Sequence, residues 1–133
     1  MTKASRLIPM LSVADMAASV RFYRDGLGGV VVYQFPPEGE PGFLTLAFGT
    51  AEMGLGVLGD NPIHGRQLRP ASGHRIELCL NVDDVDAAVT ELEAIGAPLV
   101  LPPTDQPWGE RAAYVEDPDG NLVMLVAPIG PST

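Results

Sequence analysis

The chain contains two similar stretches, RLIPMLSVADMAASV at Arg6–Val20 and RIELCLNVDDVDAAV at Arg75–Val89, which lie 69 positions apart. Six of the fifteen aligned pairs are identical, and the match continues beyond them when one residue near Gly26 is dropped. Each stretch begins as an apolar run typical of a buried strand and passes through an aspartate into a helical pattern. The repeat therefore predicts two similar modules that pack around a shared surface.

Each half predicts one helix followed by more strands, in the order βαβββ. Asp15 and Asp84 are expected to cap the helices, and Asp117–Asn121 (DPDGN) is expected to form a tight turn. The expected strands are Leu7–Val13, Val30–Phe35, Phe43–Phe48 and Met53–Leu58, then Ile76–Val82, Leu99–Leu101, Arg111–Val115 and Leu122–Ala127. We predict an α+β fold in which two βαβββ modules in tandem form half-open curved sheets around a central cavity.

The length of 133 residues predicts a single domain. Module one is expected to span about residues 6–58 and module two about residues 75–127, joined by a linker at about 59–74 that could also act as a lid. Because each half alone is of marginal size, the halves are expected to need each other or a second chain.

The net charge of −9 argues against binding to nucleic acid or to an anionic membrane. It indicates either a cationic ligand or simply a solvated acidic surface. No apolar run approaches the length of a membrane span. Cys79 is the only cysteine, so no disulfide can form within the chain, and we read it as a small buried apolar residue. These features predict a cytoplasmic protein.

The paired modules, the run NVDDVDAA at Asn81–Ala88 and the run YVEDPDGN at Tyr114–Asn121 resemble the vicinal oxygen chelate superfamily. This superfamily includes glyoxalase I, extradiol dioxygenases, fosfomycin-resistance enzymes and bleomycin-resistance proteins. The resemblance covers roughly Leu7 to Ala127 and implies a small-molecule ligand and a homodimer. It does not by itself define the chemistry, because one fold can carry different functions.

The resemblance also implies a divalent metal, held at positions that correspond here to Ile8, approximately Gly54, Glu77 and Met124. Only Glu77 offers a ligand for a hard divalent ion, since Ile8 and Gly54 have no donor and a thioether suits Cu(I). One carboxylate does not make a metal site. We therefore expect no catalytic metal and no cofactor.

Five residues of module two are the candidates for ligand binding: Glu77, Trp108, Arg111, Tyr114 and Met124. Glu77 anchors a cationic or donor group of a ligand, forms a structural ion pair with Arg75 or Arg111, or is exposed at an open cavity mouth. Tyr114 corresponds to a catalytic tyrosine of extradiol dioxygenases, but core packing is the simpler interpretation. Trp108 and Arg111 either contact a ligand or anchor a loop or a dimer interface. Met10, Met53 and Met124 either line a cavity or belong to the core.

The leading hypothesis is a metal-free small-molecule-binding protein that resembles bleomycin-resistance proteins and would sequester an aromatic or cationic drug, as in antibiotic resistance. The alternative is an enzyme of the same superfamily, either a glyoxalase-like lyase or isomerase or a dioxygenase-like oxidoreductase. A regulatory module with a vestigial site is a third interpretation.

Overall fold

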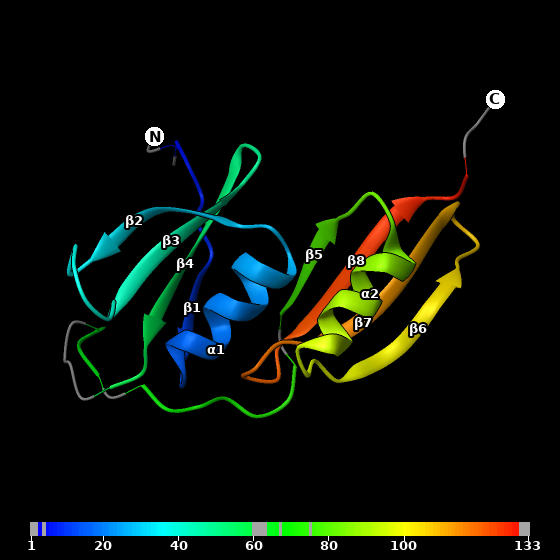
Figure 1. Cartoon of the computed structure of the whole chain (residues 1–133). Coiled ribbons are helices and arrows are strands. Elements are labelled where there is room, and N and C mark those ends of the chain that lie inside the picture. The colour runs from blue at the N-terminus through cyan, green and yellow to red at the C-terminus, as the bar shows by residue number, and fades with distance from the viewer. Residues whose placement is uncertain (1–2, 4, 60–63, 67, 75, 131–133) are drawn as a thin grey trace. The chain divides into compact units, whose positions relative to one another are not determined.

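The computed structural model describes residues 3, 5–59, 64–66, 68–74 and 76–130. It divides into two compact units, Met1–Ala71 and Ser72–Thr133, and their boundary lies within the segment predicted as the linker. Each unit contains one four-stranded sheet with a helix on one face (Figure 1). The predicted α+β class and the βαβββ order of each module are confirmed.

The first sheet has the strand order β1-β4-β3-β2. Strand β1 is parallel to β4, whereas β3 is antiparallel to both of its neighbours. Asp15 caps the helix as predicted, because its carboxylate accepts a hydrogen bond from the backbone N–H of Ala18 at 3.1 Å. The elements of this unit are β1 (Met10–Val13), α1 (Met16–Val20), the π-helical turn η1 (Arg21–Gly26), β2 (Val30–Phe35), β3 (Phe43–Phe48) and β4 (Ala51–Val57).

The second sheet repeats this plan with the order β5-β8-β7-β6, in which β5 is parallel to β8. Asp84 caps α2 by accepting from the N–H of Ala87, also at 3.1 Å. The predicted turn at Asp117–Asn121 connects β7 to β8, and Gly120 adopts the positive φ of 82° that the turn needs. The elements of this unit are β5 (Glu77–Asn81), α2 (Val85–Ala94), β6 (Leu99–Asp105), β7 (Glu110–Glu116) and β8 (Leu122–Pro128).

Several predicted bounds differ from the structure: β1 begins at Met10 rather than Leu7, and β6 is longer than predicted. We expected a loop from Pro102, but β6 continues through Pro102 and Pro103 to Asp105. Strand β6 lies at the edge of its sheet, where a residue without a backbone N–H is tolerated, and its register to β7 is irregular between Leu101 and Thr104. The first helix changes to a wider π-helical turn at Arg21, a change that the 3.6-residue pattern did not indicate.

Each sheet has a face covered by its helix and a face without a helix, which we call the open face. The covered faces form the core, where Leu46 and Leu55 of the first unit and Val123 and Leu125 of the second are fully buried. Because side chains alternate along a strand, residues two apart share a face. Thus Met10, Phe43 and Gly56 lie on the first open face, and the second carries the residues Glu77, Cys79, Tyr114 and Met124.

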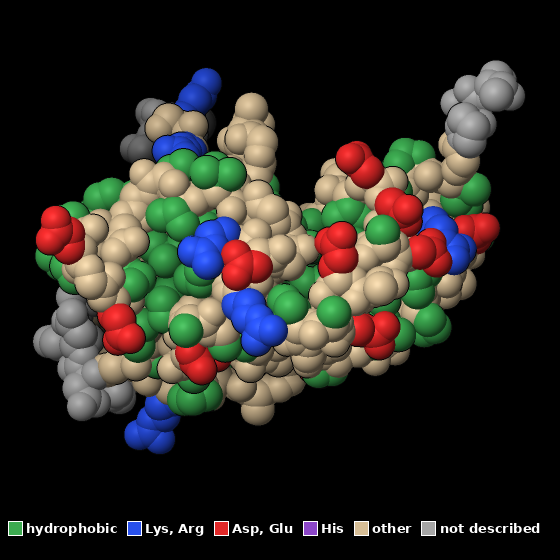
Figure 2. All heavy atoms as spheres, viewed as in Figure 1, with side chains coloured by type: hydrophobic (Ala, Val, Ile, Leu, Met, Phe, Trp, Pro, Cys, Tyr) green, Lys and Arg blue, Asp and Glu red, His purple; other side chains and the backbone are tan. Residues whose placement is uncertain are grey.

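The excess of acidic over basic side chains lies entirely in the second unit. Residues 1–71 contain six basic and six acidic side chains, whereas residues 72–133 contain two basic and eleven acidic ones. Figure 2 shows many more acidic than basic side chains around α2. The net charge therefore says nothing about the ligand preference of a site in the first unit.

In the described part of the chain, no helix has the length and apolar character needed to cross a membrane.

Candidate functional site

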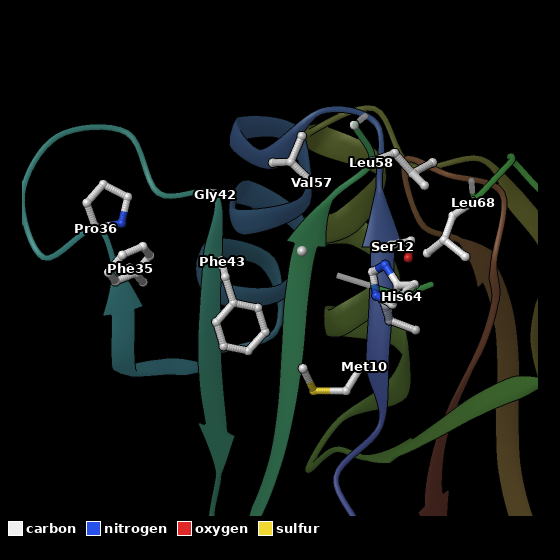
Figure 3. A pocket seen from close by; sticks show the side chains of 13 residues that line it. Met10, Ser12, Phe35, Pro36, Gly42, Phe43, Val57, Leu58, His64 and Leu68 are labelled. Atoms are coloured by element: carbon white, nitrogen blue, oxygen red, sulfur yellow. The ribbon is translucent and has the colours of Figure 1, made fainter. Parts of the chain in front are cut away.

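The first unit carries a cavity of about 800 Å³ on its open face (Figure 3). Its walls are largely apolar, with Phe43 of β3, Met10 of β1 and Phe35 of β2 among them. Ser12 and His64 contribute polar groups. The volume lies within the range of sites that bind small organic molecules.

The two glycines of β4 shape this face. Gly54 and Gly56 alternate along β4, so both positions on the open face of a central strand lack a side chain. A Cβ atom at Gly56 would have only Phe43 Cδ1 within contact range, at 3.7 Å, which leaves the space above it open. The pattern Gly-Leu-Gly at Gly54–Gly56, within a strand, was a signal in the sequence for this cavity.

The space above Gly54 is closed by the side chain of Met10. A Cβ atom there would lie 2.5 Å from Met10 Sδ and 3.2 Å from Phe43 Cε1. Figure 3 shows the Met10 side chain extending across β4 toward the ring of Phe43. The structure thus places Met10 in the cavity wall, whereas Met53 is a core residue that is 6% exposed.

The positions that correspond to the superfamily's metal ligands do not fit a metal ion. In the first unit Ile8 and Gly54 offer no donor, and a thioether occupies the space over Gly54. In the second unit Glu77 is the only hard ligand beside the thioether of Met124. Among the described residues, no group of three His, Cys, Asp or Glu side chains is placed to hold a metal ion.

The second open face brings together Glu77, Tyr114 and Met124 of the five candidate ligand-binding residues. Met124 of β8 lies between Tyr114 of β7 and Cys79 of β5 in the strand register. Glu77 is two residues before Cys79, so its side chain is on the same face of the sheet. The pKa of Tyr114 is raised by burial first, and then by the negative charge of Glu77. The phenol is therefore protonated at neutral pH.

Cys79 is exposed, so the prediction that it is buried was wrong. Its place on the open face of β5, rather than against α2, accounts for this exposure. The pKa of its thiol is nevertheless raised, mainly by partial desolvation and then by the charges of Glu110 and Glu77. Since the thiolate is the nucleophile, this environment makes Cys79 a poor one at neutral pH.

Arg111 lies on the covered side of the second sheet, away from Glu77. Its guanidinium donates to both carboxylate oxygens of Asp86 on α2, at 2.7 and 3.0 Å, and to Asp105 at 3.0 Å. The Arg111 guanidinium is therefore directed to Asp86 and Asp105 and not to Glu77. Arg75, the other partner considered for Glu77, lies outside the described residues.

Trp108 lies in the hairpin between β6 and β7 and is 59% exposed. Its indole N–H donates to Glu110 Oε1 at 2.8 Å, which holds the ring against the start of β7. This contact fits the interpretation of Trp108 as a loop anchor, while its exposed ring remains accessible to a planar ligand.

The chain belongs to the Glyoxalase/Bleomycin resistance protein/Dioxygenase superfamily, whose family model matches residues 7–125. The resemblance inferred from the sequence is thereby confirmed.

Its relatives do not identify the ligand. An uncharacterized protein of Mycobacterium bovis is 30% identical over 126 residues, which cover 92% of this chain and 83% of the relative. A member of the same superfamily from Sphaerobacter thermophilus has a TM-score of 0.68 at 28% identity, covering 91% of this chain and 96% of that one. The hypothetical protein SA1046 of S. aureus has a TM-score of 0.76 at 20% identity with 95% coverage of both chains, a likeness of fold alone.

Proposed function

We propose that this chain is a small-molecule-binding protein that works without a catalytic metal. The observation that carries the proposal is the apolar cavity on the first open face, where Gly56 leaves room for a ligand. The proposal is also supported by the poor donor set at the family's metal positions, where Glu77 is the only carboxylate.

The cavity favours a flat, largely apolar ligand. Phe35 and Phe43 offer aromatic surfaces, and Met10 adapts to irregular apolar shapes. A cationic ligand, which the overall charge favoured, is not required here because the first unit has balanced charges. Sequestration of such a compound, as in antibiotic resistance, is the physiological role we propose, with the cytoplasm as its compartment.

Calorimetric titration with 2-naphthol tests this proposal. The compound carries a flat apolar body, and with about 11 non-hydrogen atoms it should bind with a dissociation constant of about 0.1 mM. We expect one saturable site per chain and recovery of the compound unchanged. A lack of saturable binding by both 2-naphthol and its analogue 2-methylnaphthalene would contradict the proposal.

One observation favours an enzyme as the second candidate. Tyr114 and Glu77 share an open face, and the charge of Glu77 contributes to the raised pKa of the phenol, so a protonated phenol lies near a carboxylate that could act as a base. A compound that is converted by the wild type, and bound but not converted by Glu77→Gln, would establish this alternative.

We also propose that the protein forms a homodimer. Strand β2 is an edge of the first sheet, and several of its apolar side chains are exposed, including Val30 at 62% and Phe35 at 61%. Exposed apolar edges favour association with another chain. A mass of 14.0 kDa by light scattering at micromolar concentration would exclude a stable dimer.

A further inference from the structure

Thr45 of β3 presents a buried polar group without a partner. The residue is 7% exposed, and in the described part of the chain its Oγ1 is the one buried side-chain nitrogen or oxygen atom that has no hydrogen-bond partner. Burying a hydroxyl without a hydrogen bond is unfavourable. A hydrogen-bonding group of a ligand would satisfy this atom.

Thr45 lies on the same open face as the cavity. It is two residues from Phe43 on β3, and its register partners are Gly54 on one side and Tyr33 on the other. Because Gly54 has no side chain, the Met10 thioether and the Phe43 ring fill the space over it. On the other side, the Tyr33 ring lies 6.1 Å from the Phe43 ring, measured between centroids.

Two side chains on the open face near Thr45, those of Met10 and Phe43, also line the cavity. Met10 is 57% exposed, and its unbranched side chain can turn about three bonds. A turn of Met10 away from Gly54 would free space over the strand position that pairs with Thr45.

We propose that Thr45 is the polar anchor of this cavity and that Met10 moves to admit a ligand's hydrogen-bonding group to it. This inference rests on the proposed function and specifies the ligand class. The ligand has an apolar ring or chain that fills the cavity and a neutral hydroxyl, carbonyl or amide at one end. A threonine hydroxyl both donates and accepts, so it pairs with any of these groups.

The test compares two probes of similar shape, 2-naphthol and 2-methylnaphthalene, with wild type, Thr45→Val and Thr50→Val. Valine keeps the shape of threonine and removes the hydroxyl. Thr50 lies in the exposed turn between β3 and β4, so its replacement is a matched control. The measured quantity is the ratio of the two dissociation constants in each protein. Differences in the hydration of the free probes cancel when this ratio is compared between proteins.

We expect Thr45→Val to reduce the preference for 2-naphthol about 5- to 20-fold, the size of one hydrogen bond, while Thr50→Val leaves it unchanged. An unchanged preference in Thr45→Val would overturn the inference but not the proposed function. If neither probe binds to the wild type, both the inference and the proposed function are contradicted.

A second measurement separates a ligand anchor from a structural hydroxyl. Without ligand, Thr45→Val should unfold at the same urea concentration as the wild type or at a higher one, because it removes an unsatisfied buried group. A clear decrease in the urea midpoint would mean that the hydroxyl has a partner within the protein, and this would overturn the inference.

Discussion

Replacement of Gly56 by phenylalanine should weaken the binding of 2-naphthol by about 2–3 kcal/mol, a loss of about 30- to 150-fold. The new ring would occupy the cavity, since a side chain at this position meets only Phe43 at an ordinary contact distance. The ligand would then lose about 100 Å² of apolar contact, at about 25 cal/mol per Å². The fold should persist, because phenylalanine is favoured in strands and glycine is not. Calorimetric titration measures the effect.

Ala51→Phe is the matched control for this variant. Ala51 begins the same strand, is exposed and does not line the cavity, so the added ring should leave the affinity unchanged. If Gly56→Phe binds 2-naphthol as tightly as the wild type does, the ligand binds elsewhere. The open face with Glu77 and Tyr114 would then be the next candidate.

Replacement of Asp117 by alanine should lower the free energy of unfolding by about 2–4 kcal/mol. This carboxylate is 3% exposed and accepts hydrogen bonds from the backbone N–H groups of Asp119, at 2.9 Å, and Asn121, at 2.8 Å. It also accepts one from the side-chain amide of Asn121 at 2.8 Å. The substitution removes all three bonds from the turn that holds β7 against β8. Urea unfolding measures the loss.

Two further variants sharpen the Asp117 experiment. Asp117→Asn keeps one acceptor oxygen and should lose less stability than Asp117→Ala. Asp83→Ala removes an exposed carboxylate beside the cap of α2 and should change stability by no more than about 0.5 kcal/mol. An Asp117→Ala protein as stable as the Asp83→Ala protein would show that the turn does not depend on this carboxylate.

The features that the sequence predicted well are those with a local cause. Asp15 and Asp84 each precede a helix and satisfy a backbone N–H of its first turn, and Gly120 follows Pro-Asp in a turn that needs positive φ. The repeated order of elements follows from such signals. The end of β6 was not predictable in this way, because prolines are tolerated there only through the edge position of the strand.

The five candidate residues chosen from the sequence all lie outside the cavity of the first unit. Charged and aromatic residues drew attention to the second unit, where Glu77 and Tyr114 share an open face. Arg111 lies on the opposite face of the sheet from these residues. Its guanidinium pairs with Asp86, which is 25 positions away in the sequence and lies on α2. The cavity of the first unit depends on the missing side chain at Gly56, and the missing side chain at Gly54 makes room for Met10, which reaches over from a neighbouring strand. The strand register that brings these residues together cannot be read from local sequence.

The central claim is that a ligand binds to this protein without a metal. Its most direct test is elemental analysis of protein purified without chelators, with the 2-naphthol titration performed on the same sample before and after treatment with EDTA. We predict a metal content far below one ion per chain and the same dissociation constant in both titrations. One tightly bound Zn, Mn, Ni or Fe ion per chain, together with binding that is lost after EDTA treatment, would contradict the claim.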